Sequence, residues 1–328
     1  MLAATVTRFS PGSPLDALRV AERPEPEARA GWTVVDVRAA ALNHHDLWAL
    51  RGMSGLREEQ LPMILGTDAA GTTDDGREVV VHAVVGSSVR TAAPVFPDEP
   101  RSLLSEKHPG TLAQRVAVPT GNLVDKPRDL SFEEAACLPT AWLTAYRMLF
   151  REAGLRPGQS VLVQGAGGGL ASAAIMLAHA VGIDVVATAR TPEKRELATA
   201  LGATTALEPG TRVPHRVDAV IESVGAATWE HSLRSVRPGG VVVVAGVTSG
   251  DPTPAQLRRV FFDELTVRGV MVGGRDELAD LLSLLVRTGL RPRIDTTVPL
   301  ADTGRGLRRM LDGDVRGKVV VVPPSDGS

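Results

Sequence analysis

A run of glycines after a short apolar segment is the part of the sequence whose chemistry is most direct. The β-rich segment Val161–Gln164 leads straight into Gly165–Gly169, and the Ala-rich helical segment Leu170–Ala180 follows. Glycines let the backbone turn tightly and approach a pyrophosphate, while free N–H groups at a helix start bind phosphate. We therefore expect a bound dinucleotide here rather than a flexible loop. The expected contacts are Gly165, Gly167, Gly168, Gly169 and Leu170.

The end of the next β-rich segment, Val185–Ala189, bears on the choice of cofactor. NAD-selective sites usually place an acid there for the ribose hydroxyls, but here Arg190 follows, and Asp184 lies at the other end of the segment. Arg190 and Lys194 could pair with a 2′-phosphate, with Arg195 adding to the local field. The alternative is that these are ordinary solvated charges. The pattern favours NADPH over NADH.

Strand and helix signals alternate on both sides of the glycine run. The expected strands are Val161–Gln164, Val185–Ala189, Val217–Ser223 and Val241–Ala245, and the expected helices begin at Gly169, Pro192 and Thr228. Apolar β-branched runs separated by helices indicate a doubly wound α/β domain with a parallel sheet, a Rossmann domain, which we place at residues 122–269. In such a domain, ligands lie at the carboxyl ends of the strands. The further cofactor contacts expected there are Val224, Gly246, Val247, Thr248, Val270 and Val272.

The rest of the chain has a different pattern. The first 120 or so residues carry short β-rich runs, at Trp32–Ala39, Glu78–Val85 and Gln114–Val118, with no long helix. Ser131 is a plausible N-cap, and a helix is expected over Pro139–Ala153. Near the C-terminus we expect helices over Asp276–Thr288 and Thr303–Asp312 and a strand over Lys318–Val322. This tail is too short to be a domain, so residues 1–121 and 270–328 are expected to form one domain together.

Composition excludes several classes of protein. With 43% hydrophobic and 23% charged residues and a net charge of -2, the chain indicates a packed globular protein without a nucleic-acid footprint. No apolar run approaches the roughly 20 residues that cross a bilayer, and Met1–Arg8 carries no signal or transit pattern. We therefore expect a cytoplasmic protein with a small-molecule partner. The single cysteine, Cys137, excludes an internal disulfide and a four-thiolate zinc site.

Taken together, several segments give a specific signature. They are Ala41–Trp48, Leu65–Gly71, Leu138–Tyr146, the glycine run and Arg237–Gly240. In this order the chain resembles the medium-chain dehydrogenase/reductase superfamily over nearly its whole length. The resemblance implies that the β-rich domain is a GroES-like catalytic domain.

The resemblance also concerns metal binding. Zinc alcohol dehydrogenases of this superfamily have cysteine, histidine and cysteine where this chain has Asn43, Thr67 and a residue near Thr140, and none of the three replacements is a credible zinc ligand. The branch that fits is the zinc-independent quinone oxidoreductases and enone reductases. A substitute site would need His44, His45, Asp46 and Asp68. Adjacent histidines point to different sides of a regular element, so we expect no metal.

The resemblance implies hydride transfer from NADPH to a quinone or an α,β-unsaturated carbonyl. Asn43 would donate a hydrogen bond near the nicotinamide or substrate, Trp48 would form an aromatic wall, and Thr67 would complete the catalytic set. The alternatives are a loop-capping Asn43 and a core Trp48. The cofactor contacts implied by resemblance are Thr140, Thr144 and Lys318. Related reductases often have tyrosines where this chain has Trp48 and Ser54, so the proton could come from solvent.

Two other functions and one assembly are compatible with the sequence. The chain could be a zinc-free alcohol or aldehyde oxidoreductase, or a non-catalytic NADPH-binding protein. Phe261–Val272 resembles the edge strand through which this superfamily pairs its subunits, and pairing removes an unprotected apolar edge. We therefore expect a homodimer; a monomer would result if this edge were covered internally.

Overall fold

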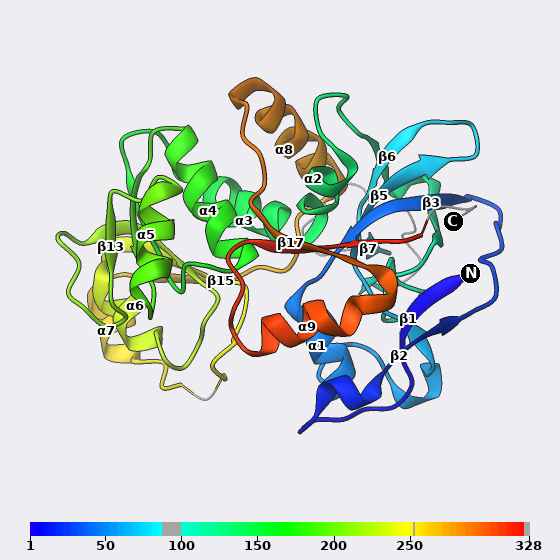
Figure 1. Ribbon diagram of the computed structural model, residues 1–328. Helices are drawn as coiled ribbons and strands as arrows, with labels where there is room; N and C mark the ends of the chain where they lie inside the picture. The colour runs from blue at the N-terminus through cyan, green and yellow to red at the C-terminus, as the bar shows by residue number, and fades with distance from the viewer. Residues whose placement is uncertain (87–99, 252, 325–328) are drawn as a thin grey trace. The chain divides into compact units, whose positions relative to one another are not determined.

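The chain divides into two compact units. The computed structural model describes residues 1–86, 100–251 and 253–324. The first unit consists of Met1–Thr140 with Gly273–Ser328, and the second of Ala141–Val272. In Figure 1 the second unit is drawn in green to yellow.

The second unit alternates strands and helices. Its strands are β11 (Ser160–Val163), β12 (Asp184–Thr188), β13 (Thr205–Leu207), β14 (Val217–Glu222), β15 (Val236–Val244) and β16 (Thr266–Gly269). Its helices are α3 (Leu143–Tyr146), α4 (Gly169–Ala180), α5 (Pro192–Ala200), α6 (Trp229–Ser235) and α7 (Leu257–Phe262). All the strands and helices expected from the alternation are present, and Thr228 is the N-cap of α6.

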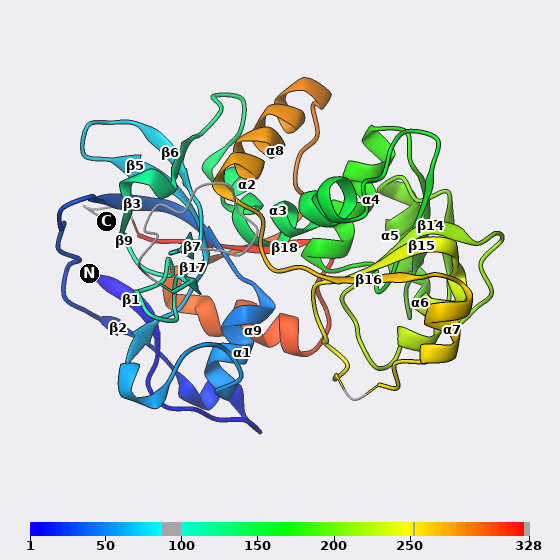
Figure 2. The ribbon, with the colours of Figure 1, turned by 180° about the vertical axis from the view of Figure 1, so that it is seen from behind.

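The six strands form one parallel sheet in the order β13-β12-β11-β14-β15-β16. This confirms the doubly wound fold. Strand order reverses at β11, and crossovers between parallel strands are right-handed, so α4 and α5 cover one face and α6 the other. Both faces are therefore buried, which explains the continuous apolar runs: Val161–Val163 and Val185–Ala187 are almost fully buried. Figure 2 shows β14, β15 and β16 lying next to one another.

Strand β16 forms an edge of this sheet, but it is shorter than the segment Phe261–Val272 that the sequence indicated. Only Thr266–Gly269 is extended, whereas Phe261 and Phe262 end helix α7. The apolar pattern of the segment did not reveal that its first part is helical, because short apolar runs fit a strand and a helix equally well.

The first unit is β-rich. Its strands are β1 (Leu2–Val6), β2 (Leu18–Glu22), β3 (Trp32–Ala41), β4 (Met63–Ile64), β5 (Asp68–Thr73), β6 (Glu78–Val81), β7 (Val84–Val85), β8 (Ser102–Leu103), β9 (Arg115–Pro119), β10 (Leu123–Asp125), β17 (Ile294–Pro299) and β18 (Lys318–Val322). Its helices are α1 (His44–Arg51), α2 (Phe132–Ala136), α8 (Arg275–Thr288) and α9 (Thr303–Leu311). Its largest sheet runs β10-β6-β5-β3-β18-β17, with β9 paired to β3.

Strands from the first 125 residues and from the C-terminal segment together form this sheet. Strand β18 pairs antiparallel with β3, with Val320 opposite Ala41 and Val321 opposite Ala40. The described C-terminal segment thus belongs to the first unit. The boundaries lie at residues 140 and 272 rather than at 121 and 269, since β10 pairs with β6 and α2 packs on β3 and β5.

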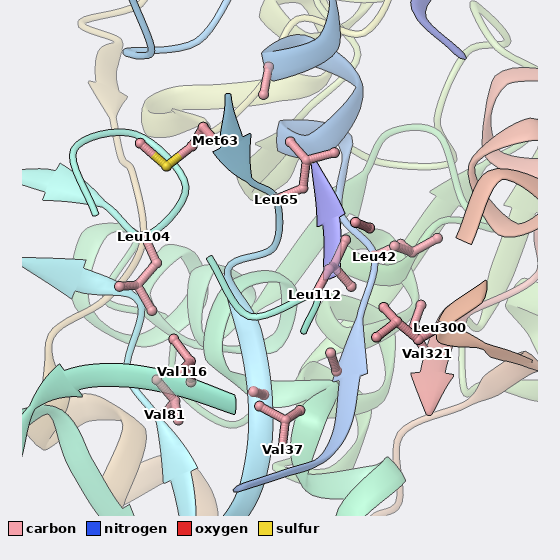
Figure 3. Packing of buried hydrophobic residues seen from close by; sticks show 14 of the residues in the cluster. Val37, Leu42, Met63, Leu65, Val81, Leu104, Leu112, Val116, Leu300 and Val321 are labelled. Atoms are coloured by element: carbon pink, nitrogen blue, oxygen red, sulfur yellow. The ribbon is translucent and has the colours of Figure 1, made fainter. Parts of the chain in front are cut away.

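The core of the first unit lies between its strands and the helices α1 and α9. Figure 3 shows part of it, in which Val37 and Leu42 of the β3 region belong to the same cluster as Leu300 and Val321 from the C-terminal segment. Leu65 and Leu112 are fully buried in the same cluster. Residues far apart in sequence therefore share one core, which includes side chains of β3, β5 and β18.

Local sequence signals predicted the start of α2 and the helical segment that follows it. Ser131 caps α2: its hydroxyl accepts from the Glu134 N–H, and the Glu134 carboxylate accepts from the Ser131 N–H. The segment expected as one helix over Pro139–Ala153 is helical, with π-helical turns on both sides of α3. Within the described ranges, no helix is long and apolar enough to cross a membrane.

Candidate active site

The glycine turn of the second unit joins β11 to α4. Gly165 and Gly167 have φ angles of +72° and +122°, which favour glycine. A Cβ atom on Gly165 would lie 2.6 Å from Val224 Cγ2, and one on Gly167 would lie 2.9 Å from Lys194 Cδ. The backbone conformation therefore favours glycine at both positions, and at Gly165 the packing of Val224 against the turn adds to this.

Not every amide of this turn faces outwards. The Gly165 N–H donates to Thr188 Oγ1 (3.3 Å), and the Ala166 N–H donates to the Thr188 carbonyl (2.7 Å). Helix α4 begins after Gly168 without a side-chain cap, so the N–H groups of its first turn, Gly169–Ala171, are left to a ligand or to solvent. Positive dipole and free donors coincide there, so the turn fits a dinucleotide phosphate. Gly165 shapes the turn without offering its own N–H.

A buried set of hydrogen-bonded polar side chains contacts the backbone of the glycine turn. Thr188 Oγ1 donates to Gln164 Oε1 (2.6 Å), and Gln164 Nε2 lies 2.9 Å from His231 Nδ1. His231 Nε2 lies 2.8 Å from the Thr211 carbonyl, so it carries the proton and Nδ1 accepts. Burial lowers the pKa of His231 and favours this neutral form. The orientation of the Gln164 amide is thereby fixed.

The same set reaches the loop after β14. Gln164 Nε2 also donates to Ser232 Oγ (3.0 Å), and Ser232 donates to the carboxylate of the fully buried Glu222. Glu222 Oε1 in turn accepts from the N–H groups of Val224 and Gly225, at 2.8 and 3.0 Å. These side chains connect the glycine turn with the Val224 loop. Sequence patterns did not single them out, because they are scattered polar residues of ordinary type.

Two cations lie near the turn in the positions expected for a 2′-phosphate. Arg190 follows β12 and is exposed. Lys194 lies in the first turn of α5, with its aliphatic stem against Gly167. The chain thus places positive charge next to the turn, at the carboxyl end of the second strand of the sheet.

Two other charged residues of this region have structural partners. Arg195 Nη1 donates to the Ala189 carbonyl (3.1 Å), and its guanidinium pairs with Glu208 (3.2 Å). Asp184 starts β12 and accepts from Thr204 Oγ1 (2.5 Å). Arg195 therefore links the segment after β12 to Glu208. The carboxylate of Asp184 is hydrogen-bonded to Thr204 at the end of β12 that is far from the glycine turn.

The remaining cofactor contacts expected in this unit follow the other parallel strands. Val224 follows β14, Gly246, Val247 and Thr248 follow β15, and Val270 and Val272 follow β16. Because the strands are parallel, these segments lie at the same sheet edge as the glycine turn. Thr144 is a buried residue of α3. The topology thus brings the strand-end residues together.

A second polar cluster lies in the first unit, around Lys318 at the start of β18. Its ammonium group donates to Asn43 Oδ1 (2.7 Å), the Leu42 carbonyl (2.8 Å) and Asp68 Oδ2 (2.9 Å). Lys318 is 3% exposed and Asp68 fully buried. Three strands position this cluster, because Asn43 follows β3, Asp68 begins β5 and Lys318 begins β18.

The cluster continues from Asn43 to two threonines. Asn43 Nδ2 lies 3.1 Å from Thr67 Oγ1 and 3.4 Å from the Ala41 carbonyl, and Thr67 Oγ1 lies 3.0 Å from Thr140 Oγ1. The structure therefore brings Asn43, Thr67, Thr140 and Lys318 together, although they are far apart in sequence. Trp48 is outside this hydrogen-bonded set: it is half-buried on α1, with its ring 6.4 Å from that of His44.

Asp46 has a structural role beside the cluster. Its carboxylate accepts from the Asn43 N–H (2.8 Å) and the Gly66 N–H (3.0 Å). Complete burial raises the pKa of Asp46, and the hydrogen bond from the Asn43 amide works against this rise. Asp46 thus fixes the start of α1 and the turn before β5, the two segments that carry Asn43 and Thr67.

The residues of this cluster do not fit a zinc ion. His45 bonds Glu106 at 3.1 Å, and the Lys318 ammonium lies against the Asp68 carboxylate. Within the described part of the cluster, Asp68 Oδ1 is buried without a hydrogen-bond partner. Burial raises the pKa of the Cys137 thiol to about 12, which disfavours the thiolate that zinc binds. Among the residues that the structure describes, no group of three or more His, Cys, Asp or Glu side chains could hold a metal.

Comparisons with known families and proteins agree with this architecture. A family model described as an alcohol dehydrogenase GroES-like domain matches residues 29–128, and one described as a zinc-binding dehydrogenase matches residues 169–287. Solved structures of dehydrogenases and reductases resemble almost the whole chain. An NAD-dependent alcohol dehydrogenase has a TM-score of 0.88 and 32% identity, over 98% of this chain and 99% of that chain. The crotonyl-CoA carboxylase/reductase AntE in complex with NADP has a TM-score of 0.88 and 26% identity, over 98% and 94%.

Curated relatives extend over the same length. A zinc-type alcohol dehydrogenase-like protein of Schizosaccharomyces pombe is 30% identical, over 94% of this chain and 96% of its own. A 2-methylene-furan-3-one reductase of Solanum lycopersicum is 33% identical, over 91% and 73%. The chain is therefore an oxidoreductase of the medium-chain dehydrogenase/reductase superfamily and belongs to its enone reductase branch.

Proposed function

We propose that this protein transfers hydride from NADPH to a quinone or an α,β-unsaturated carbonyl without zinc. The observation that carries the proposal is the Lys318 cluster. Where zinc alcohol dehydrogenases are expected to bind metal, Asn43, Thr67 and Thr140 bond to one another instead. Amide and hydroxyl groups can donate hydrogen bonds to a carbonyl oxygen that gains negative charge, so no Lewis acid is needed.

The choice of NADPH rests on the second unit. The α4 amides suit the pyrophosphate, and Arg190 and Lys194 suit the 2′-phosphate, which an arginine can bind in a bidentate manner. The NADP complex of AntE supports this choice. When bound, NADPH supplies the hydride. The residues of the chain bind and orient the reactants and stabilise charge on the carbonyl oxygen.

The test is an NADPH oxidation screen with matched substrates: a quinone, an enone, an enal and the corresponding saturated carbonyls, each with and without a chelator. We expect turnover of the conjugated compounds and the quinone, the same rate with chelator, and a lower rate with NADH. Loss of activity on chelation that added zinc restores would overturn the metal-free assignment. Tight NADPH binding without any turnover would favour a non-catalytic role.

One observation favours a second function. The similarity to an NAD-dependent alcohol dehydrogenase at 32% identity is compatible with reduction of simple carbonyls. The same screen separates the two functions, because an alcohol or aldehyde oxidoreductase would use the saturated carbonyls as well as the conjugated ones.

We also propose that the protein forms a homodimer through the edge strand β16. Val267 on this strand is 45% exposed, and a strand that pairs on one side only favours association with another edge. Analytical ultracentrifugation should show a dimer for the wild type and a monomer for Val267→Lys. Val286→Lys, which changes a valine of similar exposure on α8, is the matched control and should remain a dimer. A monomeric wild type would refute this part of the proposal.

A further inference from the structure

We propose that Lys318 fixes the direction of a hydrogen-bond chain through Asn43 and Thr67, so that the Thr140 hydroxyl presents its proton to the carbonyl oxygen of the substrate. In this arrangement Thr140 is the catalytic donor, and Lys318, Asn43 and Thr67 are positioning residues. The inference rests on the proposed reduction of a carbonyl compound, and it moves the donor role from Asn43 to Thr140.

The direction of the chain begins at the ammonium group. An ammonium group has three protons and accepts no hydrogen bond. The three protons of Lys318 are directed at the Leu42 carbonyl, Asn43 Oδ1 and Asp68 Oδ2, all within 2.9 Å. The opposite orientation of the Asn43 amide would place its NH2 group against the ammonium. Lys318 therefore fixes the Asn43 oxygen on its own side and the nitrogen on the other.

The Asn43 nitrogen then determines the role of Thr67. Asn43 Nδ2 carries two protons, directed at Thr67 Oγ1 and, at the longer distance of 3.4 Å, the Ala41 carbonyl. Both amide protons thus face the protein, and Asn43 is 7% exposed. Thr67 Oγ1 accepts one of these protons and must place its own elsewhere.

Thr67 can place its proton on one side-chain acceptor. Thr67 is fully buried. Among the described residues, the polar side-chain atoms within hydrogen-bond distance of its hydroxyl are Asn43 Nδ2 and Thr140 Oγ1. A buried hydroxyl proton without an acceptor is costly, by about 1–3 kcal/mol. Thr67 therefore donates to Thr140.

Thr140 is the last member of the chain. Its hydroxyl accepts from Thr67, so its own proton is directed elsewhere, and its side chain is partly exposed. A pre-oriented donor of this kind stabilises an oxygen that gains negative charge as hydride reaches the conjugated carbon. The Asp68 carboxylate balances the charge of Lys318. The hydrogen-bond chain therefore orients the Thr140 proton and adds no net charge.

The direction can be observed without any turnover. In a neutron diffraction map of crystals grown in D2O, we expect the deuterium between the two threonines to be bonded to Thr67 Oγ1. Deuterium bonded to Thr140 Oγ1 on that line would overturn the inference. This result does not depend on the proposed function, because it concerns the protein alone.

Kinetics test the role of the terminal donor. Thr140→Val keeps the shape and removes the hydroxyl, and we expect kcat for the enone to fall about 100-fold with the Kd for NADPH unchanged. Thr140→Ser restores the hydroxyl and should recover most of the lost kcat. If Thr140→Val instead weakens NADPH binding and leaves kcat intact, the hydroxyl serves the cofactor and the inference is wrong. A wild type that reduces no carbonyl compound would refute the proposed function, and the catalytic role of Thr140 with it.

A reversal of the chain separates direction from simple packing. Asn43→Asp is nearly isosteric, and aspartate caps a helix as well as asparagine does. One carboxylate oxygen can still accept from Lys318, but the other can only accept from Thr67, which turns the Thr140 proton inward. We expect kcat to fall about as far as in Thr140→Val. The double variant should be no slower than Thr140→Val alone, because both changes remove one donation. Multiplicative losses would contradict the inference.

Removal of the charge that orients Asn43 gives the last test. Lys318→Met with Asp68→Asn removes the ammonium and its counter-charge together, so neither is left buried and unpaired. Asn43 can then turn, and we expect kcat to fall while Thr140 is present but to change little in the Thr140→Val background. An equal loss in both backgrounds would show a structural role only.

Discussion

The two candidate regions of this protein work through different parts of the chain. In the glycine turn the backbone provides the binding groups: the α4 amides offer donors, and the absence of side chains at Gly165 and Gly167 makes the turn possible. In the Lys318 cluster the functional groups are side chains, which run as hydrogen-bonded neighbours from Lys318 through Asn43 and Thr67 to Thr140. Substitutions should therefore act differently in the two regions.

The difference also concerns what supports each region. The glycine turn rests on a buried hydrogen-bonded set that joins Gln164 and His231 to the Glu222 carboxylate, whereas the Lys318 cluster contains a buried ion pair. A buried ion is costly when its partner is removed, since desolvation is no longer offset. The first unit should thus lose more stability on a single polar substitution, and the second unit more ligand affinity on a single glycine substitution.

The largest expected effect is on the stability of the first unit. Asp68→Asn leaves the Lys318 ammonium buried without a counter-charge, so we expect the free energy of unfolding to fall by about 3 kcal/mol. Urea denaturation followed by circular dichroism measures this change. Asp125→Asn is the matched control: it removes a carboxylate of the same unit whose pair with Arg77 is solvent-exposed. The control should be nearly silent, and equal losses in both variants would contradict the contrast.

Binding by the glycine turn should be sensitive to bulk. Gly165→Val introduces a Cβ atom that would lie 2.6 Å from Val224 Cγ2, and the overpacking should weaken NADPH binding by roughly 100-fold, or about 2.7 kcal/mol. Titration calorimetry gives the Kd. Gly210→Val has a similar positive φ, +83°, with no atom within 4 Å of the new Cβ, so it carries the backbone strain without the collision. NADPH affinity reduced equally by both would indicate general instability of the unit.

Cofactor selectivity should respond to a side chain even where the backbone binds the pyrophosphate. Arg190→Ala removes a cation from the carboxyl end of β12, and we expect kcat/KM for NADPH to fall roughly tenfold, while that for NADH stays the same. Steady-state kinetics with both cofactors measure the ratio. Arg212→Ala, another exposed arginine of the second unit, should not change it. An equal loss with both cofactors would remove the basis for NADPH selectivity.

The fold could be predicted well where signals are local. The alternation from Val161 to Ala245 gave the parallel sheet, because each strand is buried on both faces and reads as an apolar run. The short helix α1 was not predicted, although Asn43, Asp46 and Gly52 carry the usual signals of helix ends. The sequence predicts a domain boundary after residue 121, whereas the structure divides the units after Thr140, because the pairing of β10 with β6 is a long-range contact that no local pattern reveals.

The sequence indicated which residues form the candidate site better than it indicated how they are arranged. Asn43, Thr67, Thr140 and Lys318 were identified through a family resemblance, since their spacing in the sequence carries no signal. Their hydrogen bonds could not be predicted, because the orientation of an amide depends on which neighbours can only donate. The three Lys318 protons face protein acceptors, so its expected role as a cofactor contact gives way to a positioning role in the proposal above.

The smallest expected effect concerns Cys137, the residue whose type would most readily suggest a metal ligand. Cys137 is the single cysteine and lies close to Thr140, near which zinc enzymes of the superfamily carry a ligand. Its Sγ donates to the Glu133 carbonyl (3.2 Å), and burial raises its pKa to about 12, so the protonated thiol persists through the neutral and mildly alkaline range. Cys137→Ser can keep this hydrogen bond, and we expect kcat within about twofold of wild type and no change in bound metal by mass spectrometry. Joint loss of zinc and activity would assign Cys137 to a metal centre, and the side chains of the first unit would then act as metal ligands and not only as hydrogen-bond donors and acceptors.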